Sequence, residues 1–354
     1  MKTTKIFAIA TAALAMSFAS CNKETGNISS DEMTQLSVRI NGVTATRAVE
    51  APGSKVPGTI KFIPDGNHSI FVINPQGDVI KYVDLDVIEA VSPAGQELSD
   101  VPADARIYII ANIPDDDAAT IQGLATWNAI KAATSDMVTQ VDYKEAALAN
   151  STGAPVGFAA VNGEATVNVS IKPLISRLEL VQVKTTDNKT GDITAFKVTG
   201  VFVDSYYPEF TYVGSGSGSP FAQGQSAIFN GIGDEGDWAA ESSPLAAKPG
   251  DDVVWAYQVA AAGVPRLIIR LEDVKYTPNS EEEIELEGIY YLTVSGYKTI
   301  TEFERGKIYR IGGADGITFT YEDLSLTANP VDITLSVEVT IEEWDIEEPD
   351  AELM

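Results

Sequence analysis

Short runs of β-branched and aromatic residues follow one another along almost the whole chain. Val, Ile, Tyr and Phe are enriched in these runs, whereas Gly, Pro, Asn and Asp stand between them. A βαβ fold would place helical patterns between the strands, and few are present. The pattern therefore predicts a mainly β protein built from β-sandwiches. The predicted strands are 69–74, 78–83, 106–111, 165–171, 176–183, 195–203, 252–259, 266–271, 284–294, 307–311, 317–321 and 332–341.

Two segments carry helical patterns instead. Asp117 can cap a helix that follows a cluster of acidic residues. Four apolar residues would fall on one face of that helix: Ile121, Leu124, Trp127 and Ile130. A shorter helix is predicted at 142–149, where Glu145 completes a capping pattern.

Composition limits what the chain can do. Its 354 residues, enough for about two domains, include 51 acidic and 24 basic residues, for a formal net charge of −27. Such an acidic chain repels nucleic acid and anionic lipid. The 44% of hydrophobic residues argue against general disorder. A single Cys and a single His exclude an intrachain disulfide and a Cys/His zinc site.

The first 20 residues are predicted to be a lipoprotein signal peptide. Lys2 and Lys5 precede an almost entirely apolar stretch, 6–19, which is too short to span a bilayer as a mature helix. Small residues lead to Cys21, the only cysteine, which would be lipidated and become the new N-terminus. The alternative is an ordinary secretory signal with an unrelated cysteine.

A strand is predicted soon after this signal. Residues 22–35 are polar and indicate a tether, after which Leu36, Val38 and Ile40 alternate with polar residues. Period-two alternation is typical of a half-buried strand. The Asn-Gly pair at 41–42 indicates a tight turn or a bulge.

The C-terminal region shows the same alternation more strongly. At Glu342 and Glu343 the phase slips by one residue, so later apolar residues take the opposite parity. Such a strand can pair within its own domain or leave to complete another molecule's sheet, and the pattern favours neither. The candidate side chains are Leu335, Val337, Val339, Ile341, Trp344 and Ile346.

Other candidate sites have weaker support. His68 lies in a turn-like segment, 65–68, and is predicted to be a solvated loop residue. Paired carboxylates are too numerous to single out a catalytic couple. Their many oxygen ligands leave a calcium site possible, although no EF-hand spacing is present. The aromatic segment 206–212 could stack on sugars or contact a host protein, but an ordinary strand end is the preferred interpretation. The Gly/Ser tract 214–220 is predicted to be a surface loop rather than a phosphate cradle.

The order of several motifs resembles that of the fimbrillins, subunits of the type V pili of Bacteroidales. Each motif is weak alone, and the specificity lies in their order along nearly the whole chain. The motifs are the lipidation Cys21, a leader ending at 46–48, the strand 106–112 before an acidic turn, the segment 176–180, the segment 303–311 and a final strand closing at Trp344.

The resemblance implies two β-sandwich-like (transthyretin-like) domains, 48–173 and 174–354, with one or two short helices in the first. It implies export as a lipoprotein to the outer membrane, followed by cleavage between Arg47 and Ala48 by an arginine-specific surface protease. Cleavage would remove the propeptide 21–47 with its leader strand. The exposed trough would accept a donor strand from the region 332–354. The implied partners are other copies of this chain, related pilus subunits and a host or bacterial adhesion target.

The leading hypothesis is therefore a structural subunit of a cell-surface fimbrium that supports adhesion and biofilm formation, with no catalytic site, cofactor or metal. The main rival is a glycan-binding lipoprotein of the outer membrane, which exposed Trp and Tyr platforms would favour. A secreted hydrolase would need a concave cluster of carboxylates that the sequence does not reveal.

Overall fold

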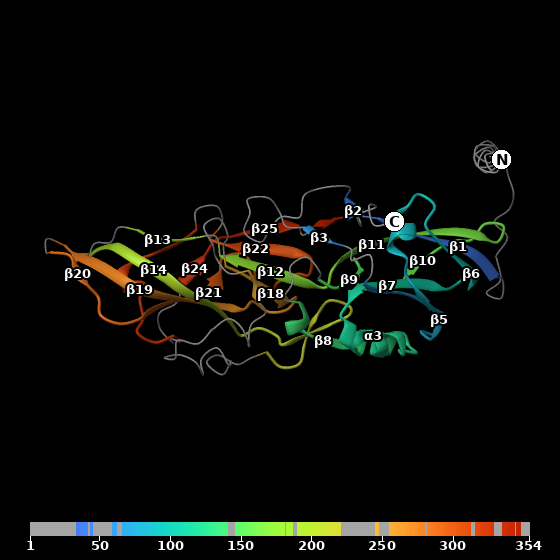
Figure 1. The fold of residues 1–354 in the computed structure, drawn as a ribbon, viewed down its shortest axis with the longest axis horizontal. Helices are drawn as coiled ribbons and strands as arrows, with labels where there is room; N and C mark the ends of the chain where they lie inside the picture. The colour runs from blue at the N-terminus through green and yellow to red at the C-terminus, as the bar shows by residue number, and fades with distance from the viewer. Residues whose placement is uncertain are drawn as a thin grey trace, which may run out of the picture.

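The protein is an elongated, mainly β molecule with two hydrophobic cores placed one after the other along its long axis (Figure 1). The structure is a computed structural model. It describes residues 33–41, 43–44, 59–61, 66–140, 146–180, 182–186, 190–220, 245–247, 255–279, 282–312, 316–328, 335–343 and 345–347. We call the parts around the first and second cores the N-terminal half and the C-terminal half.

The N-terminal half is built on one sheet, in which the first of the described strands occupies an inner place. Across the sheet the strands are β5 (Val79–Asp84), β4 (Asn67–Ile73), β7 (Arg106–Ile113), β9 (Leu148–Asn150), β11 (Glu164–Pro173), β1 (Met33–Asn41) and β6 (Gln96–Pro102), and β10 (Val156–Gly157) pairs with β7. The continuous apolar runs of β4 and β7 are buried on both faces, as expected of central strands.

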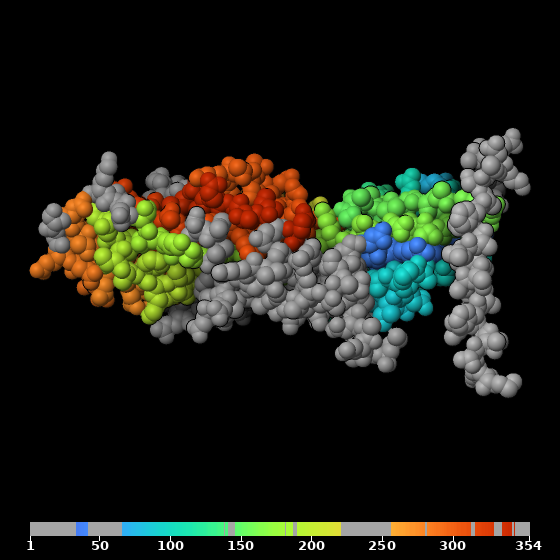
Figure 2. All heavy atoms as spheres, turned by 90° about the horizontal axis from the view of Figure 1, so that it is seen from above, coloured from blue at the N-terminus to red at the C-terminus, as the bar shows by residue number. Residues whose placement is uncertain are grey.

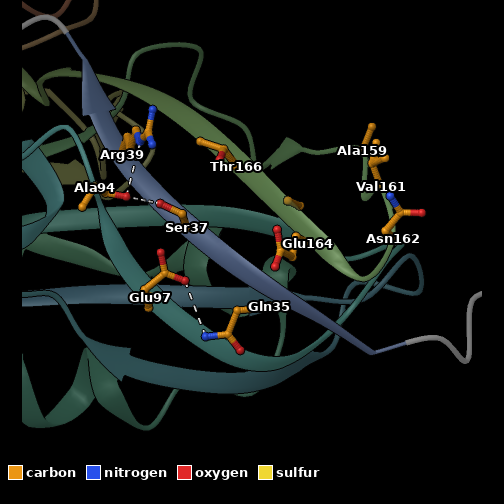
Figure 3. A pocket seen from close by; sticks show the side chains of 11 residues that line it. Gln35, Ser37, Arg39, Ala94, Glu97, Ala159, Val161, Asn162, Glu164 and Thr166 are labelled. Atoms are coloured by element: carbon orange, nitrogen blue, oxygen red, sulfur yellow. Dashed lines mark hydrogen bonds between the residues drawn. The ribbon is translucent and has the colours of Figure 1, made fainter. Parts of the chain in front are cut away.

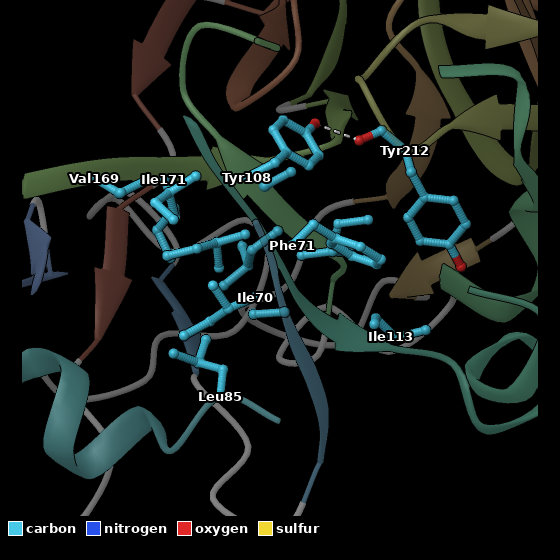
Figure 4. Packing of buried hydrophobic residues seen from close by; sticks show 14 of the residues in the cluster. Ile70, Phe71, Leu85, Tyr108, Ile113, Val169, Ile171 and Tyr212 are labelled. Carbon is cyan, nitrogen blue, oxygen red and sulfur yellow. Dashed lines mark hydrogen bonds between the residues drawn. The ribbon is translucent and has the colours of Figure 1, made fainter. Parts of the chain in front are cut away.

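Hydrogen bonds join the two outermost strands of this sheet. Lys81 Nζ on β5 donates to the Ser99 carbonyl on β6 at 2.8 Å. Gln96 Nε2 on β6 donates to the Asp84 carbonyl on β5 at 2.9 Å. The sheet therefore curls around its own core, where side chains such as Ile70, Phe71 and Val169 pack together (Figure 4).

Short helices accompany the N-terminal sheet, and two of them replace one predicted helix. The single helix expected from Asp117 to Ile130 is two helices, α3 (Asp115–Gln122) and α4 (Trp127–Ala132). Thr126 begins the second helix, because its Oγ1 accepts from the Ala129 N–H at 3.1 Å. Further helical turns are α2 (Val87–Val91) and the 3₁₀ turn η2 (Met137–Gln140).

The helix predicted at 142–149 is wrong at its C-terminal end. Residues 148–149 belong to strand β9, where they pair with both β7 and β11. Residues 142–145 lie outside the described residues. Two-sided strand pairing therefore overrides the local helical preference.

The C-terminal half is a β-sandwich. One sheet has the order β17 (Leu245–Ala247), β18 (Trp255–Ala260), β12 (Ile175–Leu180), β22 (Lys307–Ile311), β25 (Val339–Glu343). The other has the order β14 (Gly191–Asp204), β19 (Arg266–Pro278), β21 (Tyr290–Tyr297), β24 (Leu335–Val337), with β20 (Ile284–Glu285) paired to β19. A two-stranded sheet of β13 (Val183–Thr185) and β23 (Ile317–Phe319) and the 3₁₀ turn η3 (Tyr321–Asp323) complete this half.

A small sheet and a buried tyrosine pair hold the segment 209–217, which follows strand β14 of the C-terminal half, against the first core. The sheet has the order β16 (Gly216–Ser217), β15 (Glu209–Thr211), β8 (Thr134–Asp136). Tyr108 OH donates to the Tyr212 carbonyl at 2.6 Å (Figure 4). Tyr212 OH donates to Asp117 Oδ2 at 2.7 Å. Burial, together with the hydrogen bond and charge of Asp117, raises the pKa of the Tyr212 phenol, which keeps its donor proton.

The aromatic segment 206–212 therefore has a structural role. Tyr206, Phe210 and Tyr212 are buried, and Tyr207 is half-buried. This agrees with the interpretation as an ordinary strand end and removes this segment as a platform for sugars.

The prediction of a solvated His68 is wrong. His68 lies in β4 and is only 5% exposed, and its Nδ1 accepts from the Asn112 N–H at 3.0 Å. The pairing of β4 with β7 shifts register between Asn67 and Ser69, so His68 occupies an irregular position. Its ring nitrogen bonds an N–H from the neighbouring strand, which explains why a polar side chain is buried there.

The part of the chain that the structure describes contains neither a membrane-spanning helix nor a metal-binding cluster. No helix there is both long enough and apolar enough to cross a bilayer. No group of three or more His, Cys, Asp and Glu side chains there is placed to hold a metal ion.

Replacing Tyr212 tests how much its hydrogen bond to Asp117 stabilises the protein. We expect Tyr212→Phe to lower the free energy of unfolding by roughly 1.5–3 kcal/mol, because the part-buried Asp117 carboxylate loses a donor. The control is Tyr321→Phe, since Tyr321 is exposed on η3. Urea denaturation measures both variants, and equal losses would show that the Tyr212 bond adds no stability of its own.

Candidate functional site: the buried leader strand

Strand β1 lies inside the N-terminal sheet, with a partner on each side. It runs parallel to β11, with Leu36 opposite Ala165 and Val38 opposite Val167. It runs antiparallel to β6, with Val38 opposite Gln96. At the molecular surface β1 forms a blue band bordered by the green atoms of β11 (Figure 2). Both ladders of β1 are therefore satisfied.

The apolar side chains of β1 belong to the first core. Leu36 and Val38 are 0% exposed, and Ile40 is 5% exposed. Burying three such side chains contributes a gross stabilisation of roughly 5–9 kcal/mol, at about 1.5–3 kcal/mol each. The alternation thus correctly predicts a strand with one apolar face, and the structure adds that the strand is central.

The outer face of β1 borders a polar groove of about 590 Å³ (Figure 3). Ser37 Oγ donates to the Ala94 carbonyl, and Arg39 Nε donates to the same carbonyl at 3.4 Å. A Cβ on Gly95, which has φ of +77°, would lie 2.6 Å from Ser37 Oγ. The loop before β6 therefore presses closely on β1 at Ser37.

Strand β6 depends on β1 for its place in the sheet. Among the described strands β6 pairs with β1 alone, and no strand is predicted there from the sequence pattern. Withdrawing β1 would leave the facing edges of β11 and β6 without their ladder partners and would uncover the apolar trough beneath. Such paired open edges form a site for another extended strand.

The C-terminal candidate strand is divided between two sheets. The prediction of one continuous strand over 332–341 is wrong, because β24 ends at Val337 and β25 begins at Val339. β24 pairs with β21, and β25 pairs with β22. Each is the outermost strand of its sheet among the described strands.

Burial along this region is partial. Val337 is 7% exposed, Leu335 and Val339 are half-buried, and Ile341 is 49% exposed. Alternation alone does not show which sheet a residue joins, so the change of sheet at Glu338 was not predicted. Trp344 lies outside the described residues.

The last described strand returns to the N-terminal region. β26 (Asp345–Glu347) lies between β2 (Val43–Thr44) and β3 (Thr59–Lys61), parallel to both. Ile346 is the register partner of Val43 on one side and of Ile60 on the other. The two neighbours of β26 therefore precede and follow Arg47 in sequence. Cys21, Arg47 and Ala48 themselves lie outside the described residues.

Two buried carboxylates belong to ion pairs. Glu179 is buried, with its Oε2 3.2 Å from Arg310 Nε and its Oε1 3.8 Å from Arg177 Nη1. Asp204 Oδ2 lies 3.8 Å from Arg266 Nε. These carboxylates face cations rather than each other, so they do not form the couple of a glycoside hydrolase.

Solved structures show which proteins have this architecture. A protein from Bacteroides eggerthii named for cell adhesion matches with 16% identity and a TM-score of 0.55, covering 92% of this chain and all of its own. A cell adhesion protein from Parabacteroides distasonis matches with 14% identity and a TM-score of 0.52, covering 89% of this chain and all of its own. A fimbrilin from Porphyromonas gingivalis matches with 12% identity and a TM-score of 0.51, covering 89% of this chain and 98% of its own.

This chain shares their fold. The match covers nearly the whole chain, and it confirms the mainly β, sandwich-like fold expected from the resemblance to the fimbrillins. No protein-family model and no curated protein matches the sequence. The domain bounds at 48–173 and 174–354 stay predictions.

Truncating the core of β1 tests how much the strand stabilises the protein. We expect Leu36→Ala to lower the free energy of unfolding by about 2–5 kcal/mol, because it leaves a cavity at a fully buried position. Gln35→Ala, on the exposed face of the same strand, should change it by less than about 0.5 kcal/mol. Denaturant titration of the uncleaved chain measures both, and similar values would show that β1 is not part of the core.

Proposed function

We propose that this protein is a structural subunit of a type V pilus, assembled by donor-strand exchange at the cell surface. The observation that carries the proposal is β1: a strand near the start of the chain completes the first core and lies between two other strands. A strand in that place can be exchanged for an equivalent strand from another molecule. The likeness in fold to a fimbrilin and to cell adhesion proteins supports the same function.

Cleavage between Arg47 and Ala48 by an arginine-specific surface protease would permit the exchange. Until that cut β1 is part of the same chain as the sheet, so it reforms its ladders whenever they open. After the cut the leader is a separate segment that can be diluted away. The trough under Leu36, Val38 and Ile40 then becomes available to the C-terminal strand of another subunit.

The route to the surface follows from the predicted signal. Lipidation of Cys21 would anchor the precursor to the outer membrane, with β1 already in its groove. The leader would thus prevent assembly before export. Cleavage after Arg47 would cut the covalent link between the mature subunit and its lipid, after which β1 could leave the sheet. Adhesion and biofilm formation would be functions of the assembled fimbrium.

The rival functions have less support from the site. A glycan-binding lipoprotein needs exposed aromatic platforms, but the aromatic segment 206–212 is mostly buried. A hydrolase needs facing carboxylates, whereas Glu179 and Asp204 face arginines. Neither alternative explains why a segment before a predicted protease site is built into the sheet.

Removal of the predicted protease site tests the proposed function. We expect the purified chain, treated with an arginine-specific protease, to form ladders that survive mild detergent. The same treatment of Arg47→Ala should leave monomer, because the leader stays covalently attached. Gel electrophoresis without boiling measures the ladders.

The matched control is Arg106→Ala, which removes an exposed arginine elsewhere and should form ladders normally. Ladders of equal intensity from Arg47→Ala would overturn the assigned cut. The absence of ladders from the unaltered chain would overturn polymerisation triggered by this protease.

A further inference from the structure

The leader strand and the C-terminal strand contain the same three residues in succession. Leu36, Ser37 and Val38 are matched by 335–337, which are again Leu, Ser and Val. The next two positions are Arg39 and Ile40 in the leader and 338–339, Glu and Val, at the C-terminus. The inward-facing positions of β1 thus have counterparts of equal or similar size.

We propose that the C-terminal strand of a second copy of this chain replaces β1 in one defined register. Leu335 takes the place of Leu36, Val337 that of Val38, and Val339 that of Ile40. This inference rests on the proposed strand exchange and adds the residues that specify it. The occupant is a second copy because this chain itself carries the matching segment.

The home position of the donor strand leaves it less buried than β1. Leu335 and Val339 are half-buried, whereas Leu36 and Ile40 are buried. At home β24 and β25 each pair on one side among the described strands, while β1 pairs on both sides. The Leu-Ser-Val sequence at 335–337 therefore gains burial and a second ladder when it moves from the edge of its own sheet into the place of β1.

On the outer face, Ser37 opposes a shift of the register in one direction. Its hydroxyl donates to the Ala94 carbonyl, and Gly95 approaches so closely that even a Cβ there would collide with it. In the proposed register Ser336 occupies this position and can make the same bond. A shift by two residues in one direction would place Glu338 against the Ala94 carbonyl, and two oxygen acceptors would then face each other.

A buried polar atom in β1 supports the same alignment. Thr34 is 2% exposed, and within the described residues its Oγ1 has no hydrogen-bond partner. The alignment places Ile333 at that position. An apolar side chain there removes the cost of burying an unpaired hydroxyl, so the donor suits this end of the groove better than the leader does.

In the proposed alignment a negative charge takes the place of a positive charge of the leader. Arg39 borders the groove together with Glu97 and Glu164 (Figure 3), and Glu338 would take its place. At home Glu338 Oε1 lies 2.7 Å from Lys298 Nζ. Insertion therefore brings a carboxylate to two others, which disfavours exchange at low ionic strength and is screened by salt.

Register-specific cross-linking tests the alignment. Ser37 is the register partner of Thr166 on β11, so the proposal places Ser336 of one copy beside Thr166 of the next. We expect the full chain with Cys21→Ala, Thr166→Cys and Ser336→Cys, after arginine-specific cleavage and mild oxidation, to give ladders that persist in boiling detergent and collapse with reductant. Two matched chains carry Thr334→Cys or Glu338→Cys in place of Ser336→Cys, each testing a shift by two residues.

The outcomes separate this inference from the proposed function. Covalent ladders chiefly from the chain with Ser336→Cys support the register. Detergent-resistant polymers that cross-link chiefly through Thr334→Cys or Glu338→Cys, or through none of the three, overturn the register and leave strand exchange standing. The absence of polymers from the unaltered chain overturns the proposed function and this inference with it.

Charge substitution tests the electrostatic part of the alignment. We expect Glu338→Arg, which restores the cation of the leader, to speed ladder formation by about two- to fivefold at low salt, with the gain shrinking at high salt. The control is Glu322→Arg, an exposed residue of η3, which changes the net charge equally. Equal acceleration by both variants would show that net charge alone acts and that Glu338 does not enter the groove beside Glu97 and Glu164.

Discussion

The pairing of β1 with β11 and β6 is the interaction on which the N-terminal half depends. β1 supplies Leu36, Val38 and Ile40 to the core and is the one described strand that forms a backbone ladder with β6. The bonds from Lys81 and Gln96 between β5 and β6 then close the curl. A short segment near the start of the chain thus holds together strands that come much later in sequence.

The polar contacts around β1 explain how so central a strand can also be replaceable. Its apolar face makes contacts that a strand of the same alternation can repeat, since burial of Leu, Val and Ile is non-directional. Its outer face has one narrow requirement, at Ser37 beneath Ala94 and Gly95. General affinity and specific register are therefore located on opposite faces of one strand.

Much of this architecture follows from period-two alternation, and the departures have identifiable causes. The strand at Leu36–Ile40 could be predicted because its apolar side chains alternate with polar ones and all face the core. The break at Glu338 was not predicted, because both halves of the segment keep the same alternation while joining different sheets. β6 was missed because its burial depends on β1, and His68 was misassigned because its partner, Asn112, lies 44 residues away.

Because of the position of β26, cleavage of the chain and dissociation of the leader would be separate events. One neighbour, β2, precedes Arg47, and the other, β3, follows it, so both new ends would stay hydrogen-bonded to a common strand. A nicked molecule would migrate as one body in a native gel and as two fragments in denaturant. Cleavage would thus prepare the subunit for strand exchange. The leader would leave only when the sheet of β2, β26 and β3 opens thermally or when a second subunit arrives.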